Sequence, residues 1–535
     1  METTPSPRSV SPAELVQMLR DGDELAIVDV REELIFARSH LLWARCVPLS
    51  RIELLIAGLI PRRSTRIVLC DDNDGLAERA AQRLAGFGYT NLMTLRGGVA
   101  GWAAAGLNLY SGVNVPSKAF GEFVEHASKT PSISADELAA LLRQGADLVV
   151  LDSRPFDEYT RMSIPSATNV PGAELVLHAR DIAPSPATTV VVNCAGRTRS
   201  IIGAQSLINA GVPNRVVALR NGTMGWSLAG LSCDHGQARR PSGFSQGGLA
   251  WAQTAANAVA DRFGIERIDI ETLDRWRSDR TRSLYIFDVR SPSEYEAGHF
   301  EGAVSAPGGQ LVQATDQYVG TLGARIVLVD EVEVRALMTG SWLRQMGFKD
   351  VFVLAARGLQ TGRPAKVILG TEPASECAIE ATQLAEAQQL GGATIVDLSL
   401  SRDYHRGHIP GAWFAIRSRM ALALAKITPR GILVLTSEDG ILAGLALQET
   451  ASLTSLPVRY LRGGNKAWQR AGFALTPDEP RLADDPIDVW LKPYERPDAA
   501  SEAMNEYLTW EVDLLPRIMR DDTIGFVHSE AKADR

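Results

Sequence analysis

The chain has 535 residues, which is more than one hydrophobic core normally organises and predicts three to five domains. Its hydrophobic content of 45% and charged content of 22% are typical of globular proteins, and its net charge of -8 argues against nucleic acid as a partner. The sequence has no apolar leader and no run of about eighteen apolar residues, so we expect a cytoplasmic protein without a membrane partner. The five cysteines are scattered, which argues against a disulfide framework and gives no metal-binding pattern.

A strand that ends in an acidic residue recurs four times, as IVDVREE, VVLDSRP, YIFDVRS and TIVDLSL. Each copy leads through a second strand and a helix to a closing motif, which reads LRGGVAGW, LRNGTMGW, AARGLQTG or LRGGNKAW. The acidic residue and the second position of the closing motif are separated by 67, 68, 68 and 65 residues in chain order. The chain is therefore predicted to contain four copies of one α/β unit.

Strands that alternate with helices predict a parallel sheet covered on both faces, so each copy should be a small doubly wound domain. We place the four domains at residues 8–112, 116–232, 264–366 and 376–478. A linker that runs into a helix is predicted for 233–263, and a loop followed by an amphipathic helix for the C-terminal tail, 479–535. Such a helix packs on a domain or on a second copy of the chain, which leaves a homo-oligomer open.

The most informative stretch is VVVNCAGRTRS, residues 190–200, in the second copy. Its three Val predict a buried parallel strand and the apolar pattern that follows predicts a helix, so Cys194 should lie in the loop between them. In such a loop backbone N–H groups and the helix N-terminus face the sulfur, while Arg197 and Arg199 add positive charge. These features stabilise a thiolate, so Cys194 is predicted to be a nucleophile rather than a small buried apolar residue.

This strand, cysteine loop and helix resemble the active-site loop of the rhodanese (thiosulfate sulfurtransferase) family, here in four tandem domains like a bacterial multidomain member. The resemblance implies that Cys194 takes a sulfane sulfur from a donor, carries it as a persulfide and passes it to an acceptor, without a metal or an organic cofactor. It also implies substrate binding by Ala195, Gly196, Arg197, Thr198 and Arg199. Supporting roles near the active site are implied for Asp152, Arg154, Glu158 and Ser200.

The length of the loop bears on the kind of chemistry. Arg199 follows Cys194 by five residues, whereas phosphatases of a related fold place the arginine six residues after the cysteine, so sulfur transfer is favoured. The commoner family loop has Gly at its fourth position, while this loop has Gly196 third and Arg197 fourth. The donor therefore stays open between thiosulfate, mercaptopyruvate and a thiol persulfide, and the acceptor between cyanide, a thiol and a protein.

The other three copies are expected to be inactive. Counting back 26 residues from the closing motif places Cys70 and Thr436 where Cys194 stands, and the register of the following helix places Asp330 there in the third copy. The acidic residues after Cys70 disfavour a thiolate, and neither Asp330 nor Thr436 can form a persulfide. These inactive copies also suggest the alternative of a binding or scaffold protein without catalysis.

Overall fold

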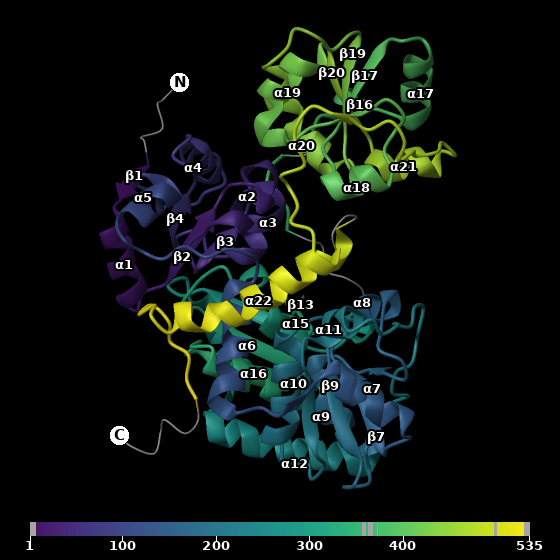
Figure 1. Cartoon of the computed structure of the whole chain (residues 1–535). Helices are drawn as coiled ribbons and strands as arrows, with labels where there is room; N and C mark the ends of the chain where they lie inside the picture. The colour runs from purple at the N-terminus through teal and green to yellow at the C-terminus, as the bar shows by residue number, and fades with distance from the viewer. Residues whose placement is uncertain (1–6, 356–359, 362–366, 372, 497–499, 529–535) are drawn as a thin grey trace.

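Four parallel β-sheets, each covered by helices, make up the chain (Figure 1). The computed structural model describes residues 7–355, 360–361, 367–371, 373–496 and 500–528. The predicted organisation into four copies of one α/β unit is confirmed, and we number these units 1 to 4 along the chain. Most of the third closing motif (356–359 and 362) and the predicted boundary at residue 366 lie outside the described residues.

Units 1 and 2 contain matching elements, joined by α6 (Val115–Ser128). Unit 1 consists of β1 (Arg8–Val10), α1 (Pro12–Arg20), β2 (Leu25–Asp29), α2 (Glu33–Arg38), β3 (Ala44–Cys46), α3 (Ile52–Leu59), β4 (Arg66–Cys70), α4 (Leu76–Gly86), β5 (Leu92–Leu95) and α5 (Gly98–Ala104). Unit 2 consists of β6 (Ser132–Ile133), α7 (Ala135–Arg143), β7 (Leu148–Asp152), α8 (Phe156–Arg161), β8 (Thr168–Asn169), α9 (Leu175–Ile182), β9 (Thr189–Asn193), α10 (Thr198–Asn209), β10 (Val216–Leu219) and α11 (Gly222–Leu228).

Units 3 and 4 repeat this order after α12 (Gln246–Phe263). Unit 3 consists of β11 (Glu266–Arg267), α13 (Ile270–Ser278), β12 (Leu284–Asp288), α14 (Pro292–Ala297), β13 (Val304–Ser305), α15 (Gly308–Gln313), β14 (Arg325–Asp330), α16 (Val334–Gln345) and β15 (Val351–Ala355). Unit 4 consists of β16 (Ala378–Ile379), α17 (Ala381–Gln389), β17 (Ala393–Asp397), α18 (Ser401–Arg406), β18 (Trp413–Phe414), α19 (Met420–Ile427), β19 (Ile432–Thr436), α20 (Ile441–Ala451), β20 (Val458–Leu461), α21 (Gly464–Arg470) and β21 (Arg481–Leu482).

One strand order recurs in the four sheets. In unit 2 it is β6-β10-β9-β7-β8, with every neighbouring pair parallel. Unit 1 repeats it as β1-β5-β4-β2-β3 and unit 3 as β11-β15-β14-β12-β13, while unit 4 gains the edge strand β21 next to β18. The strand that leads into the Cys194 loop, β9, is therefore central, and residues 190–193 are buried. The carboxyl end of β9 lies at the edge of the sheet at which sheets of this kind bind their ligands.

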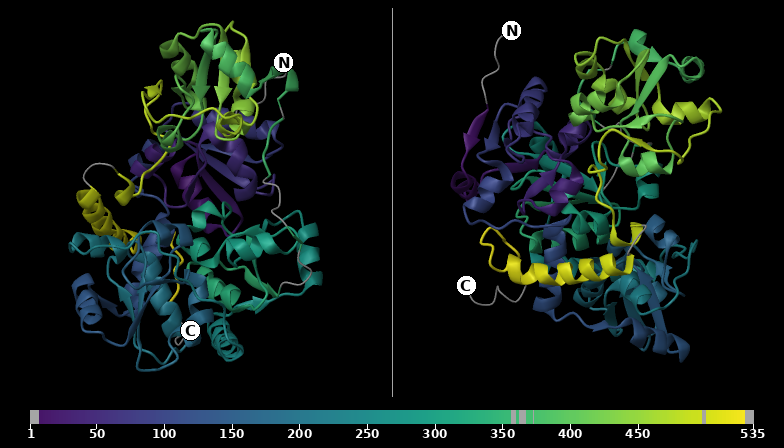
Figure 2. Two further views of the ribbon diagram at one scale, coloured as in Figure 1. Left: turned by 90° about the vertical axis from the view of Figure 1, so that its right-hand side faces the viewer. Right: turned by 45° about the horizontal axis from the view of Figure 1, so that its top comes forward.

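Two long helices outside the four units connect them. The first, α12, packs between α9 and α16, and a single hydrophobic core runs through units 2 and 3 with Ala256 and Phe263 as members. The second, α22 (Ala500–Ile518), drawn in yellow, lies along α6 (Figures 1 and 2). Its Leu514 and Ile518 pack with Val115 and Ala119 of that helix. The helical C-terminal region expected from the sequence is thus present, and it packs on the chain itself.

Units 1 and 4 meet through buried polar groups. Arg417 donates to Glu53 at 2.8 Å, and the two side chains are only 4% and 3% exposed. Glu32 of unit 1 accepts hydrogen bonds from Ser50 at 3.0 Å and from Ser418 of unit 4 at 3.1 Å. Burial raises the pKa of Glu32 to about 7, so this interface contains a carboxyl group that holds its proton more firmly than a free glutamate.

This carboxyl group predicts a pH-dependent stability. Between the ordinary glutamate pKa of about 4.3 and the raised value, the folded protein binds a proton that the unfolded chain has lost, so stability falls as pH rises. Glu32→Gln keeps a neutral group at every pH. The free energy of unfolding of Glu32→Gln, relative to that of wild type, should therefore rise by up to about 3 kcal/mol between pH 5 and pH 8, at about 1.4 kcal/mol per pKa unit. Urea unfolding of both proteins at the two pH values measures this, and a difference independent of pH would contradict it.

Candidate active site

Cys194 lies at the carboxyl end of β9, in the loop that leads into α10. Only 2% of the residue is exposed. Its Sγ lies 3.5 Å from the hydroxyl oxygen of Ser200, and that hydroxyl donates to the carbonyl oxygen of Arg197 at 2.7 Å. Ser200 thus contacts the sulfur and also ties the loop to the first turn of α10.

The backbone N–H groups of residues 195–199 donate to no protein acceptor in the part of the chain that the structure describes. They belong to the loop and to the N-terminus of α10, where a helix carries partial positive charge. Buried N–H groups normally have an acceptor. The loop is therefore arranged to receive negative charge beside the Cys194 sulfur.

The closing motif of unit 2 supports this loop from behind. The N–H of Thr223 donates to the carbonyl oxygen of Cys194 at 2.8 Å, and the N–H of Met224 to that of Ala195 at 3.0 Å. A Cβ on Gly222 would lie only 2.2 Å from the carbonyl oxygen of Cys194, and Gly222 has a φ of +54°. Both the close approach and the left-handed backbone require glycine here, which explains the glycine of the closing motif.

Arg199 and Lys492 share one carboxylate next to Cys194. Arg199 donates to Glu158 at 2.8 Å and to the side-chain oxygen of Gln310 at 3.2 Å, and Lys492 lies 3.2 Å from the other oxygen of Glu158. Burial opposes ionisation of Glu158, but Arg199 and Lys492 outweigh it and hold the pKa of Glu158 well below its usual range. Because two cations face one carboxylate, one positive charge is left for an anionic ligand.

The guanidinium of Arg197 is held by the helix α6. It donates to both oxygens of Glu122, at 2.7 Å each, and also pairs with Glu125. A further contact at 3.3 Å joins it to the side-chain oxygen of Asn221. The positive charge of Arg197 is thus neutralised by α6, and Arg197 anchors the loop and also belongs to the wall of the cavity beside Cys194.

Asp152 and Arg154 form a buried pair at the ends of the central strands. Arg154 makes two hydrogen bonds to Asp152, at 2.9 and 2.7 Å, and reaches the carbonyl oxygen of Met162 at 2.6 Å. Asn193, the last residue of β9, donates to Asp152 at 3.1 Å. Neither member of the pair belongs to the described wall of the Cys194 cavity, so the pair acts on the loop through β7 and β9.

A cavity of about 220 Å³ lies beside Cys194, which forms part of its wall. Glu158 and all of residues 194–199 line it, so the structure brings these sequence-predicted residues together. Further wall residues were missed by the sequence analysis: Lys118 of α6, Gln310 and Gln313 of α15, Lys492 and Tyr494 before α22, and Tyr507 of α22. No motif marks them, and only the amphipathic pattern of the tail signalled that it packs on another part of the chain.

Helix α22 places a carboxylate beneath the loop. Glu511 is fully buried, and one of its oxygens lies 3.2 Å from the Lys118 ammonium and accepts a hydrogen bond from the Thr198 hydroxyl at 3.2 Å. The charge of Lys118 is therefore neutralised within the protein, as is that of Arg197. Arg199 and Lys492 remain the cations that serve the cavity.

Strand register corrects the positions expected for units 1 and 4. In every unit the acidic residue of the first core strand pairs with the last residue before the loop, and those partners are Cys70, Asn193, Val329 and Thr436. Cys70 and Thr436 thus match Asn193, and the prediction that they stand where Cys194 stands is wrong. The residues at the Cys194 position are Asp71, Asp330 and Ser437, which confirms the prediction for unit 3.

The error comes from one loop length. From the Cys194 position to the close-packed glycine of the closing motif, units 1 and 4 are one residue shorter than unit 2. Counting back from that motif therefore shifts the alignment onto the preceding strand residue. Cys70 is fully buried in the core of unit 1, and burial together with Asp29 raises the pKa of the Cys70 thiol well above its usual range.

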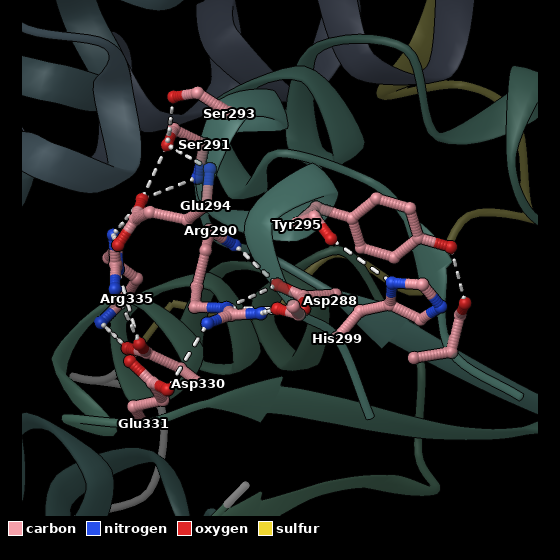
Figure 3. A network of polar contacts seen from close by, with 12 residues as sticks. Asp288, Arg290, Ser291, Ser293, Glu294, Tyr295, His299, Asp330, Glu331 and Arg335 are labelled. Atoms are coloured by element: carbon pink, nitrogen blue, oxygen red, sulfur yellow. Dashed lines mark hydrogen bonds and ion pairs between the residues drawn. The ribbon is translucent and has the colours of Figure 1, made fainter. Parts of the chain in front are cut away.

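Unit 3 shows what an aspartate does at the Cys194 position (Figure 3). Asp330 accepts from the backbone N–H of Arg335 at 2.8 Å and from its guanidinium at 2.8 Å. The same guanidinium donates to Glu294 at 2.9 Å and to Glu174 of unit 2 at 3.1 Å (Figure 3 shows the first). Three carboxylates around one arginine leave no positive charge for a ligand.

In units 1 and 4 the residue at the Cys194 position also accepts hydrogen bonds from backbone N–H groups. The Asp71 carboxylate accepts from the backbone N–H groups of Asn73 at 2.9 Å and Ala77 at 3.0 Å. The hydroxyl of Ser437 accepts from the N–H of Ala443 at 3.3 Å. In each of the three units an oxygen at the Cys194 position accepts from one or two N–H groups of the loop or of the first turn of the helix. The corresponding N–H groups of unit 2, those of Gly196, Arg199 and Ser200, have no acceptor among the described residues.

Comparison with known proteins identifies the repeated unit. The model of the Rhodanese-like domain matches residues 11–105, 134–229, 270–356 and 380–471. The crystal structure of a thiosulfate sulfurtransferase from Pseudomonas aeruginosa is 47% identical, covers 97% of this chain and 99% of its own, and superposes with a TM-score of 0.94. An uncharacterized protein of Synechocystis sp. is 32% identical over 103 residues, which are 19% of this chain. The chain spans 55% of the length of that curated relative.

Within the described residues, no group of His, Cys, Asp and Glu side chains is arranged to hold a metal ion. The described helices include none with the length and apolar content needed to cross a membrane.

The support that the closing motif gives to the loop can be tested with two glycines. Gly222→Ala should be more harmful than Gly230→Ala, because both glycines have positive φ but a Cβ on Gly230 would meet no atom within 4 Å. The left-handed backbone costs each variant about 1–2 kcal/mol, and the clash with the Cys194 carbonyl adds about 1–3 kcal/mol in Gly222→Ala alone. Thermal unfolding and the rate of Cys194 alkylation measure the difference, and equal effects would contradict this account.

Proposed function

Because the chain belongs to the rhodanese family, with four rhodanese-like domains in tandem, we propose that it is a sulfurtransferase in which Cys194 carries a sulfane sulfur. The contrast between the loops carries the proposal. In units 1 and 3 the loop N–H groups donate to the carboxylates of Asp71 and Asp330. In unit 2 a sulfur stands at that position. The N–H groups of the loop are therefore available to stabilise a thiolate or persulfide anion on Cys194.

The first half-reaction loads the cysteine. The Cys194 thiolate attacks the outer sulfur of thiosulfate, a new S–S bond forms at Sγ, and the S–S bond of thiosulfate breaks as sulfite leaves with the electron pair. One thiolate charge and two thiosulfate charges become one persulfide charge and two sulfite charges. The positive charge left by Arg199 and Lys492 beside Glu158 attracts the donor and stabilises the departing sulfite.

The second half-reaction transfers the sulfur from Cys194 to an acceptor. Cyanide, or a thiolate, attacks the outer sulfur of the persulfide, and the Cys194 thiolate is released with thiocyanate or a new persulfide as product. The 47% identity to a protein described as a thiosulfate sulfurtransferase supports thiosulfate as the donor. Mercaptopyruvate and thiol persulfides would load Cys194 by the same attack, since only the leaving group differs.

Intact-protein mass spectrometry tests the assignment. Reduced wild-type protein should gain one sulfur atom from thiosulfate and lose it again to cyanide, whereas Cys194→Ala should gain none and should have no detectable turnover. The matched variant Cys70→Ala should load like wild type, because Cys70 is fully buried in unit 1, and should cost about 1 kcal/mol of stability, a typical value for a point change.

Other outcomes of this experiment would change the donor, the cysteine or the kind of function. Loading with mercaptopyruvate or a thiol persulfide but not with thiosulfate would keep Cys194 and change the donor. Equal loss of loading in Cys70→Ala and Cys194→Ala would overturn the choice of cysteine. No loading from any of the three donors would contradict sulfur transfer and favour a scaffold without catalysis.

A further inference from the structure

One wall of the Cys194 cavity comes from the stretch of chain that joins unit 4 to α22. We call residues 487–495 the connecting segment, which Figure 1 shows in yellow, running from unit 4 toward α22. Four of its residues line the cavity: Trp490, Lys492, Pro493 and Tyr494. Because they lie outside the four units, the fold of unit 2 does not by itself fix the position of this wall.

Unit 1 holds the middle of the connecting segment. The N–H of Trp490 donates to a side-chain oxygen of Glu33 at 3.1 Å, and the N–H of Leu34 donates to the carbonyl oxygen of Ile487 at 2.9 Å. Glu33 and Leu34 begin α2. A hydrogen bond to a carboxylate is about twice as strong as one between neutral groups. Among the described residues the Glu33 side chain makes no other hydrogen bond, so it is free to serve this one contact.

Units 4 and 2 hold the segment on either side of Trp490. Asp488 accepts from the backbone N–H of Ser401 in unit 4 at 2.7 Å. Nearer to α22, Arg161 of unit 2 donates to Glu495 at 2.9 Å, but the arginine side chain is 54% exposed, and ion pairs in water contribute little. The contacts with units 1 and 4 are therefore the stronger attachment of the connecting segment.

We propose that Glu33 of unit 1 is a positioning residue for the Cys194 site, because it fixes the connecting segment at Trp490. The inference rests on the proposed function, in which Lys492 attracts the anionic donor. Lys492 lies two residues after Trp490, so a segment released at Trp490 lets Lys492 move away from Glu158. Units 1 and 4, which have no cysteine at the Cys194 position, thereby take part in the reaction.

The position of the segment also determines which donors fit. The cavity has a volume of about 220 Å³, and an apolar cavity of about 150 Å³ already holds benzene. Thiosulfate, a compact anion, fits within this space, whereas a reagent several times larger meets Trp490, Pro493 and Tyr494. The connecting segment thus selects compact anionic donors as long as units 1 and 4 hold it.

Single-turnover loading of the full chain by thiosulfate tests the role of Glu33. Glu33→Ala should raise the half-saturating thiosulfate concentration about tenfold, the upper value for one hydrogen bond. The maximal loading rate should stay unchanged, because Glu33 does not belong to the cavity wall. Glu33→Leu, which keeps the bulk of the side chain without an acceptor, should match Glu33→Ala, and Glu33→Gln, which keeps an acceptor oxygen, should retain the wild-type value.

Asp181→Ala is the matched control. The Asp181 carboxylate likewise accepts from a backbone N–H of a joining segment, that of Ser245 at 2.7 Å, but lies outside the cavity wall. This variant should load like wild type. A purely structural role of Glu33 would lower the fraction of protein that loads and leave the thiosulfate dependence of the remainder unchanged, which would contradict the proposal.

Alkylation of Cys194 tests the wall without sulfur transfer. The rates with iodoacetamide and with the larger fluorescein maleimide are read on the Cys194 peptide by mass spectrometry. In Glu33→Ala the ratio of the maleimide rate to the iodoacetamide rate should rise severalfold, and in Glu33→Gln it should stay at the wild-type value. A wild-type ratio and thiosulfate dependence in Glu33→Ala and Glu33→Leu, or equal effects of Glu33→Ala and Asp181→Ala, would overturn the positioning role. Absence of loading from every donor in the wild type would instead overturn the proposed function, while the alkylation ratio would still report on Glu33.

Discussion

Backbone N–H groups at the carboxyl end of a central strand need an acceptor, and the residue at the Cys194 position of each unit decides how far the protein itself meets this need. Asp71 and Asp330 satisfy it with their own carboxylates, and Ser437 with a hydroxyl. Cys194 offers a sulfur at the same position and leaves the N–H groups of residues 195–199 without a protein acceptor. In unit 2, a negative charge on the sulfur or on a bound ligand would supply the acceptor that these N–H groups lack.

Charge neutralisation then decides which cations act on that sulfur. The two arginines of the loop differ in their neighbours: Arg197 faces two glutamates of α6, whereas Arg199 shares a single glutamate with Lys492. Lys118 is likewise held by Glu511 of α22. A site with all four cations free would attract anions without discrimination, while neutralising two of them leaves Arg199 and Lys492 as the cations that act on an anion in the cavity. The helices outside the four units are therefore part of the site's electrostatics.

Most of the fold and the centre of the candidate site were predictable, because both depend on local patterns. Alternating strands and helices and the repeated motifs give the four units, and the strand, Gly196 and the helix pattern give Cys194. The register error had an available signal: Cys194 follows Asp152 by 42 residues, as Asp71 follows Asp29. Strand pairing is set by neighbouring strands in a sheet and not by the distance to a motif whose intervening loop varies in length.

The parts that the sequence did not predict depend on contacts between distant segments. The wall residues Gln313 and Lys492 both follow unit 2 in the chain, one in unit 3 and one after unit 4, and neither belongs to a repeated motif. An amphipathic pattern indicates that a helix is covered but not by which surface. Exchange of a cysteine for an aspartate is likewise more than a local loss: around Asp330 it accompanies a guanidinium held by carboxylates of both unit 3 and unit 2. Restoring a thiol there would leave those carboxylates in place, so we expect the interface with unit 2, as much as the one residue, to keep unit 3 from carrying sulfur.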